Sequence, residues 1–89
     1  MIIRSQNKRA IRNFNLISDI VVSGTGKGIW EIIACYPYFA QSDCGFATIG
    51  EYSTEEKAIK VLDMIQKRYE EFCCNNYCSV FEMPQDSEV

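Results

Sequence analysis

Hydrophobic and polar residues alternate over short distances in the first fifty residues and follow a helical period after them. Runs rich in β-branched and aromatic residues, which favour strands, are separated by residues that favour turns. These runs occupy 1–5, 9–14, 19–23, 29–36 and 44–50. We therefore expect a β-meander over residues 1–50.

The run at 29–36 is largely apolar on both of its faces. Its apolar residues are Trp30, Ile32, Ala34 and Tyr36 on one face, and Ile29, Ile33 and Cys35 on the other. A strand with two apolar faces is typical of the middle of a sheet that is covered on both sides. We therefore expect both faces of this strand to be covered, at least in part.

One long amphipathic helix is predicted over residues 53–74. Its apolar stripe, with spacings of three and four residues, consists of Ala58, Leu62, Ile65, Tyr69 and Phe72. Such spacing places the side chains on one side of a helix. The stripe needs an apolar surface, and the predicted sheet provides one.

The start of this helix carries a capping signal. Ser53 is followed three residues later by Glu56, which is the capping-box pattern in which each side chain bonds an amide of the first turn. Thr54 is the alternative cap. Glu55 and Glu56 also suit the positive end of the helix dipole.

A short last strand is expected at 77–83, where Pro84 ends it, and 84–89 is expected to be a polar tail. The chain of 89 residues has the length of one domain, 1–89. The predicted fold class is α+β, with an antiparallel sheet of about five strands packed by one long helix.

The glycine-rich segment 23–28, Ser-Gly-Thr-Gly-Lys-Gly, invites comparison with a phosphate-binding loop. That motif needs a glycine where this chain has Val21, and Ser or Thr where it has Gly28. A strand, not a helix, is predicted to follow. We therefore interpret the segment as a hairpin turn.

The net charge of −3 is unevenly distributed, since residues 1–50 are slightly basic and residues 51–89 are acidic. The basic residues near the start are Arg4, Lys8, Arg9 and Arg12. We interpret them as the solvated face of a hairpin, and a nucleic-acid-associated regulator that uses them is the alternative function.

No apolar run approaches the about 20 residues that span a bilayer, and the N-terminus lacks the order of a signal peptide. We therefore expect no membrane partner, and a location in the cytoplasm of a bacterial host.

Five cysteines are many for this length: Cys35, Cys44, Cys73, Cys74 and Cys78. In the reducing cytosol they are expected to be thiols, mostly acting as small buried hydrophobes. A zinc-stabilised structural module, with ligands from the last three and either of the others, is a second alternative. Our expectation is no metal and no cofactor.

We expect no enzymatic activity and no catalytic residues. Histidine, the usual general acid or base, is absent from the sequence. Glu55–Glu56 and Glu70–Glu71 are adjacent on a helix exterior, where neighbouring side chains do not face each other. Solvation and end-capping explain them.

The aromatic segment Tyr36-Pro37-Tyr38-Phe39 is too apolar for an ordinary loop and belongs to an interface or to the core. Together with the acidic helix side it gives the candidate partner-binding residues. These are Tyr36, Tyr38, Phe39, Glu55, Glu56, Glu70 and Glu71.

The segments 51–66 (EYSTEEKAIKVLDMIQ) and 80–89 (VFEMPQDSEV), with the opening MIIRSQ and NFN at 13–15, resemble a group of small uncharacterised proteins encoded by phages, prophages and other mobile elements of Firmicutes. The resemblance implies an origin on a mobile element and a strand-then-helix layout. By analogy of origin, it points to a non-enzymatic accessory protein that binds a host or phage protein, as inhibitors of host defence such as anti-CRISPR proteins do. The small core also leaves a homodimer open.

Overall fold

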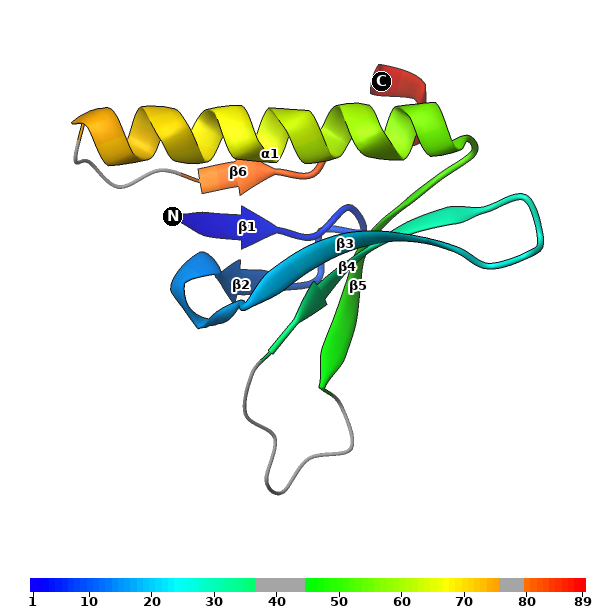
Figure 1. Ribbon diagram of the computed structural model, residues 1–89, viewed down its shortest axis with the longest axis horizontal. Helices are drawn as coiled ribbons and strands as arrows, with labels where there is room; N and C mark the ends of the chain where they lie inside the picture. Colours follow the sequence, from blue (N-terminus) through cyan, green and yellow to red (C-terminus); the bar gives the residue numbers. More distant parts are fainter. Residues whose placement is uncertain (37–44, 76–79) are drawn as a thin grey trace.

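The computed structural model describes residues 1–36, 45–75 and 80–89, without the side chains of 72–75. Figure 1 shows the long helix α1 lying along one side of a set of short strands. The strands are β1 (Ile2–Arg4), β2 (Ile11–Asn13), β3 (Asp19–Gly24), β4 (Trp30–Cys35), β5 (Phe46–Tyr52) and β6 (Val80–Glu82). The helices are α1 (Glu55–Asn75) and two short 3-10 helices, η1 (Phe14–Leu16) and η2 (Asp86–Glu88).

The described strands form two sheets of three strands, so the α+β class is confirmed but the single antiparallel sheet of about five strands is wrong. Sheet A has the order β2-β1-β6, and sheet B has the order β3-β4-β5. Sheet B is antiparallel, whereas β6 pairs in parallel with β1. The long helix separates β5 from β6, and it carries the chain back to run beside β1 in the same direction.

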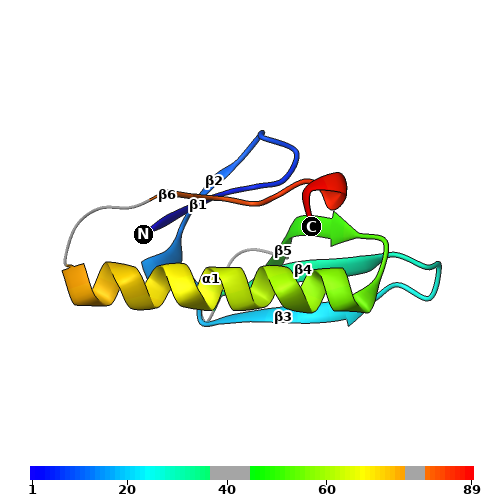
Figure 2. The ribbon, with the colours of Figure 1, turned by 90° about the horizontal axis from the view of Figure 1, so that it is seen from above.

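Sheet A and sheet B meet at Gln6, the second residue after β1. Its backbone N–H donates to the carbonyl of Ile49 at 2.9 Å, on the outer edge of β5. Seen from above, α1 lies between β3 on one side and the strands β1 and β6 on the other (Figure 2). The two sheets therefore enclose the apolar side of α1 from two directions.

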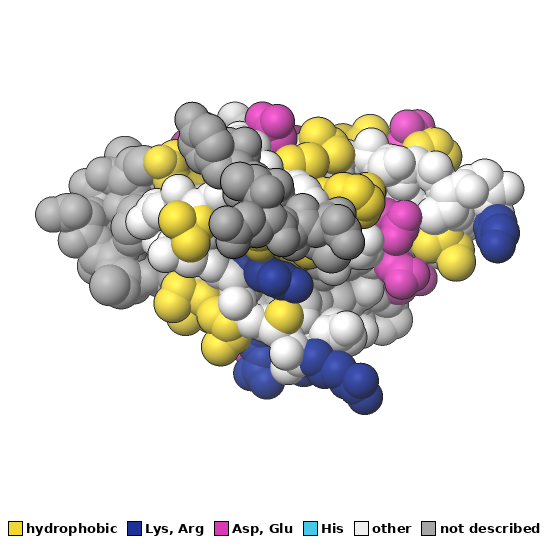
Figure 3. Space-filling model, turned by 90° about the horizontal axis from the view of Figure 1, so that it is seen from below, with side chains coloured by type: hydrophobic (Ala, Val, Ile, Leu, Met, Phe, Trp, Pro, Cys, Tyr) yellow, Lys and Arg dark blue, Asp and Glu magenta, His cyan; other side chains and the backbone are white. Residues whose placement is uncertain are grey.

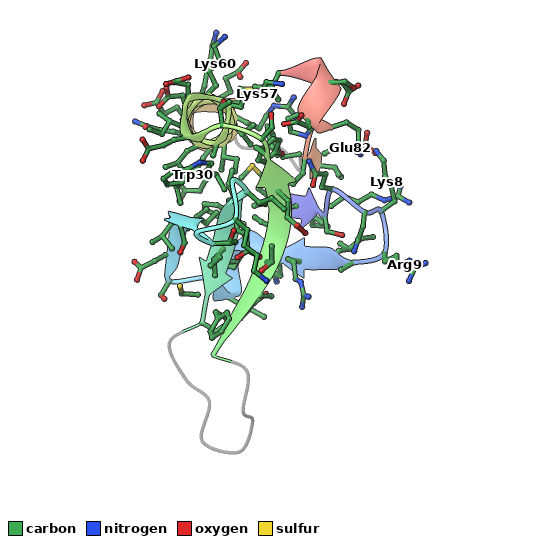
Figure 4. The ribbon with its side chains drawn as sticks, turned by 90° about the vertical axis from the view of Figure 1, so that its right-hand side faces the viewer. Lys8, Arg9, Trp30, Lys57, Lys60 and Glu82 are labelled. Carbon is green, nitrogen blue, oxygen red and sulfur yellow. The ribbon has the colours of Figure 1, made fainter. Side chains whose placement is uncertain are left out.

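The core fills the space between α1 and the inner faces of the two sheets. Its buried residues are Met1, Ile3, Ile32, Ala34, Ile49, Tyr52, Ala58, Val61, Ile65, Phe81 and Met83. Trp30 packs against this cluster and lies beneath α1 (Figure 4). Burial of each Ile, Val or Phe side chain stabilises the fold by about 1.5–3 kcal/mol. This burial holds strands as short as three residues in place.

A β-bulge in β5 sets which of its side chains enter the core. The pairing shifts between Ile33, opposite Thr48, and Ile32, opposite Gly50, so Ile49 is the extra residue. Ile49 is buried, and a Cβ at Gly50 would lie 3.0 Å from the Met83 side chain. The bulge therefore buries two consecutive positions and returns Glu51 to the exposed face.

The N-terminus of α1 is capped by Thr54, the alternative, and not by the predicted capping box. The Thr54 hydroxyl accepts a hydrogen bond from the Lys57 backbone N–H at 3.2 Å. Ser53 instead donates both its N–H and its hydroxyl to the Asp86 carboxylate, at 2.8 and 3.1 Å. Because Asp86 accepts both hydrogen bonds from Ser53, the Ser53 hydroxyl does not cap the helix.

Residues 84–89, expected to be a free polar tail, contain η2 and are fastened to the rest of the molecule. The buried Tyr52 hydroxyl donates to the Pro84 carbonyl at 2.8 Å, and Lys57 donates to the Asp86 carbonyl at 3.0 Å. Burial, with the nearby Asp86 and Glu88, raises the pKa of Tyr52. The hydrogen bond from the Ser53 amide lowers the pKa of Asp86, and desolvation opposes it with a smaller effect.

The glycine-rich segment forms the turn between β3 and β4, as expected from its composition. Gly26 and Gly28 have φ of 82° and 78°, where a side chain would be strained. No helix follows the segment, because β4 begins at Trp30.

A candidate protein-binding face

Sheet B has one face covered by α1 and one face turned away from it. The residues of the second face follow from the register of the three strands and the alternation of side chains. They are Asp19, Val21 and Ser23 on β3, Glu31, Ile33 and Cys35 on β4, and Phe46, Thr48 and Glu51 on β5. We call this set the outer face of sheet B.

The outer face has an apolar side that is open to solvent. Phe46 is 60% exposed and Val21 is 41% exposed, and Ile33 and Cys35 between them are partly buried. The apolar pattern of 29–36 predicted cover on both sides, but among the described residues only the inner face of β4 lies against a helix. Large apolar side chains gathered on one open face are typical of a binding surface.

The end of the outer face away from Phe46 carries two glutamates directly opposite each other. Glu31 on β4 pairs with Glu51 on β5, and paired side chains have Cβ atoms about 4.5–5.5 Å apart. The Thr48 hydroxyl donates to Glu31 Oε2 at 3.1 Å, which holds that carboxylate on the side of β5. Like charges opposite each other in a sheet oppose folding, so packing does not explain the pair.

Figure 3 views the molecule from the side opposite α1. Hydrophobic side chains and acidic side chains lie next to each other in this view. Among the nine outer-face positions of the described strands, three are acidic and none is Lys or Arg. The face therefore has two carboxylates at the Glu31–Glu51 end, an apolar middle, and Asp19 beside the exposed Phe46 end.

The structure divides the aromatic segment predicted to bind a partner. Tyr36 follows β4 directly, is partly buried, and donates its N–H to the Gly45 carbonyl at 2.9 Å. Tyr38 and Phe39 lie outside the described residues. Phe46, which sequence reasoning did not select, is the exposed aromatic residue on the described part of this hairpin.

The predicted acidic residues of the helix are exposed at its two ends. Glu55 and Glu56 lie in its first turn, and Glu70 and Glu71 lie four turns further along. The two pairs therefore form no common site with each other or with Tyr36.

The basic residues near the N-terminus do not form one surface. Arg4 and Lys8 each lie 3.8 Å from the Glu82 carboxylate, whereas Arg9 extends away from the molecule (Figure 4). Arg12 is paired with Ile3 and so lies on the opposite face of sheet A from Arg4. Glu82 thus pairs with two of the four basic side chains that the nucleic-acid alternative requires, and its single negative charge offsets one of their charges.

Of the five cysteines, Cys35 has a described side chain, which is a free thiol on the outer face of sheet B. Cys44 and Cys78 lie outside the described residues, as do the side chains of Cys73 and Cys74. Within the described part of the chain, no three His, Cys, Asp or Glu side chains gather as a metal site would require.

Two hollows adjoin α1. One of about 320 Å³ lies between η1 and the helix and is lined mainly by apolar residues, including Phe14, Leu62 and Tyr69. The rings of Phe14 and Tyr69 pack there with centroids 4.9 Å apart. The other, of about 390 Å³, lies between α1 and β6, where Arg68 donates to the Val80 carbonyl at 3.0 Å.

Comparison of the chain with models of protein families, with curated proteins and with solved structures found no match. Of the described helices, none has the length and apolar character that crossing a membrane requires.

Proposed function

We propose that this protein is a non-enzymatic accessory protein of a phage or another mobile element, and that it binds a host protein through the outer face of sheet B. The observation that carries the proposal is the open apolar side of that face, formed by Val21, Ile33, Cys35 and Phe46. Inhibition of a host defence system, in the manner of anti-CRISPR proteins, is the role we propose for that binding.

The contrast between the two sides of β4 supports a binding role. Ile32 and Ala34 are fully buried against α1, whereas Ile33 and Cys35 on the opposite side have neighbours that are open to water. A Phe side chain that stays largely exposed adds little to the free energy of folding, because little of its apolar surface leaves water when the chain folds. A partner that covered this side would gain about 25 cal/mol per Å² of apolar surface removed from water.

The test compares two exposed apolar residues that lie on different sheets. Phe46 is 60% exposed on sheet B, and Ile11 is 69% exposed on the outer face of sheet A, so Asp at either position leaves the core intact. Tagged wild type, Phe46→Asp and Ile11→Asp are expressed in a Firmicutes host and used for affinity capture. We expect wild type and Ile11→Asp to retain a host protein that Phe46→Asp does not.

Retention of the same protein by Phe46→Asp, or equal loss by both variants, would contradict the proposed face. The inhibitory role has its own measurement, which is plaque formation on a host whose CRISPR system targets the phage. Wild type and Ile11→Asp should restore plaques and Phe46→Asp should not. If wild type restores none while capture still depends on Phe46, the protein is a binding protein without this inhibitory role.

A further inference from the structure

We propose that the partner seated on the outer face of sheet B presents an arginine or lysine beside apolar side chains, and that this cation lies between Glu31 and Glu51. The inference rests on the proposed function, since it names the chemistry of the partner for the same face.

Charge and apolar surface lie side by side on this face. Asp19, Cys35 and Phe46 form one end, Val21, Ile33 and Thr48 the middle, and Ser23 with the glutamate pair the other end. An extended segment with alternating side chains would place successive contacts along this direction, apolar on Phe46 and Val21 and cationic on the glutamates. The matching occupant is therefore amphipathic and basic.

The glutamate pair is held in place before any partner arrives. Glu51 is fixed through its backbone, because its N–H and carbonyl both bond the Gln6 side chain, at 2.8 and 2.9 Å. Glu31 is fixed through its carboxylate by Thr48. Two carboxylates on residues that pair directly across neighbouring strands can both accept from one guanidinium, whose donors form a rigid fork.

A second copy of this chain does not suit this surface. A two-fold axis would set the same face against itself, so that six carboxylates, from Asp19, Glu31 and Glu51 of each copy, would share one interface. None of the nine positions supplies a cation to offset that repulsion, and Lys27 lies in the turn beyond the strands. The charge of the face therefore favours a different, basic partner.

The experiment uses two capped heptapeptides as probes. In one, a single arginine is flanked by leucines and valines, and in the other citrulline, which has the same shape without the charge, replaces it. Each is titrated into the full ¹⁵N-labelled chain, and backbone amide shifts are followed. We expect shifts at Val21, Ile33, Phe46 and Glu51, and about tenfold weaker binding of the citrulline peptide, which corresponds to loss of one charge pair.

The double variant Glu31→Gln, Glu51→Gln separates charge from shape. It should bind the two peptides equally, whereas Glu70→Gln on α1 should keep the preference of the wild type. Without peptide, the double variant should unfold at a higher urea concentration than the wild type, because the opposed charges are gone. An unchanged or lower midpoint would overturn the repulsion on which the inference depends.

The outcomes distinguish this inference from the proposed function. Equal binding of the two peptides, shifts centred elsewhere, or no binding at millimolar peptide overturns the basic-partner inference. Each of these leaves the proposed function standing if host-protein capture still depends on Phe46. Shifts of the same amides that grow with protein concentration alone would show a second copy on the face, which also overturns the inference. If the wild type neither captures a host protein nor binds either peptide, both the basic-partner inference and the proposed function are overturned.

Discussion

The side-chain amide of Gln6 bonds both backbone groups of Glu51, as a residue of a neighbouring strand would. Its Nε2 donates to the Glu51 carbonyl at 2.9 Å, and its Oε1 accepts from the Glu51 N–H at 2.8 Å. The same Nε2 also lies 3.2 Å from the Pro84 carbonyl, and Gln85 donates to the Gln6 carbonyl at 2.8 Å. Gln6 thus joins sheet A, sheet B and the C-terminal segment.

Replacing Gln6 by Ala should lower the free energy of unfolding by about 1–2 kcal/mol. Two hydrogen bonds to the edge of β5 are lost, each with a net worth of about 0.5–1.5 kcal/mol, and water regains part because the site is exposed. Urea denaturation followed by circular dichroism measures the change. Gln66→Ala, on the exposed side of α1, is the matched control and should stay within about 0.5 kcal/mol of wild type. Equal effects of both changes would show that Gln6 has no special role.

Tyr52→Phe removes the hydroxyl that fastens the C-terminal segment to the core. Near neutral pH we expect a loss of about 1 kcal/mol, because the Pro84 carbonyl keeps its weaker bond from Gln6. Since folding raises the pKa of Tyr52, its neutral form contributes stability that is complete below about pH 10 and is lost as the pH rises beyond that value.

The difference between wild type and Tyr52→Phe should therefore shrink above pH 10 and then reverse sign. Denaturant midpoints of both proteins between neutral pH and pH 12 measure it. The remaining tyrosines are common to both proteins and cancel in the difference. A difference that stayed constant over this range would show that the Tyr52 phenol is not buried in solution.

Asp86→Asn should lower the melting temperature at neutral pH. The lowered pKa of Asp86 means that its carboxylate contributes stability above its ordinary pKa of 3.8, and that this contribution is lost as the pH falls through the lower folded value. The gap between wild type and variant should therefore be constant at neutral pH and narrow below about pH 4. Thermal melts across that range test this expectation. Asp63→Asn, at an exposed position of α1, is the matched control and should leave the melting temperature at neutral pH close to that of the wild type.

Thr54→Ala should destabilise the protein by about 1 kcal/mol, the usual cost of losing a helix cap. Glu56→Ala should cost at most a few tenths of a kcal/mol, since its carboxylate acts on the helix dipole alone at an exposed position. The two variants thus separate the observed cap from the capping box read from the sequence. The reverse order of the two losses in urea denaturation would favour the capping box.

Local patterns were enough to predict most elements. The spacing of Ala58, Leu62 and Ile65 placed the helix, and β-branched runs placed β3, β4 and β5. Glycines marked the turn between β3 and β4. These signals lie within a few residues of one another, and they act through backbone preference and the side on which apolar residues fall.

Distant contacts decided what the local patterns left ambiguous. Ser53 and Glu56 match a capping box, but Asp86, thirty-three residues away from Ser53, takes the Ser53 donors. Three residues of β6 carry too little pattern to name a partner strand, and burial of Phe81 beside Ile3 places them in parallel with β1. Only part of the candidate face could be predicted from the sequence. The apolar outer side of β4 was evident, but Phe46 and Glu51 join this face through strand pairing and the bulge in β5.

The sequence alone determined that this chain is α+β, with one long helix after a series of strands, because the period of its hydrophobic residues does not depend on the rest of the molecule. Only the tertiary structure decided that the strands divide into two sheets, that the last residues are fastened by Tyr52 and Ser53, and that one apolar face stays open. Those outcomes depend on which distant side chains meet. That is settled by the joint packing of α1, sheet A and sheet B, not by any one segment.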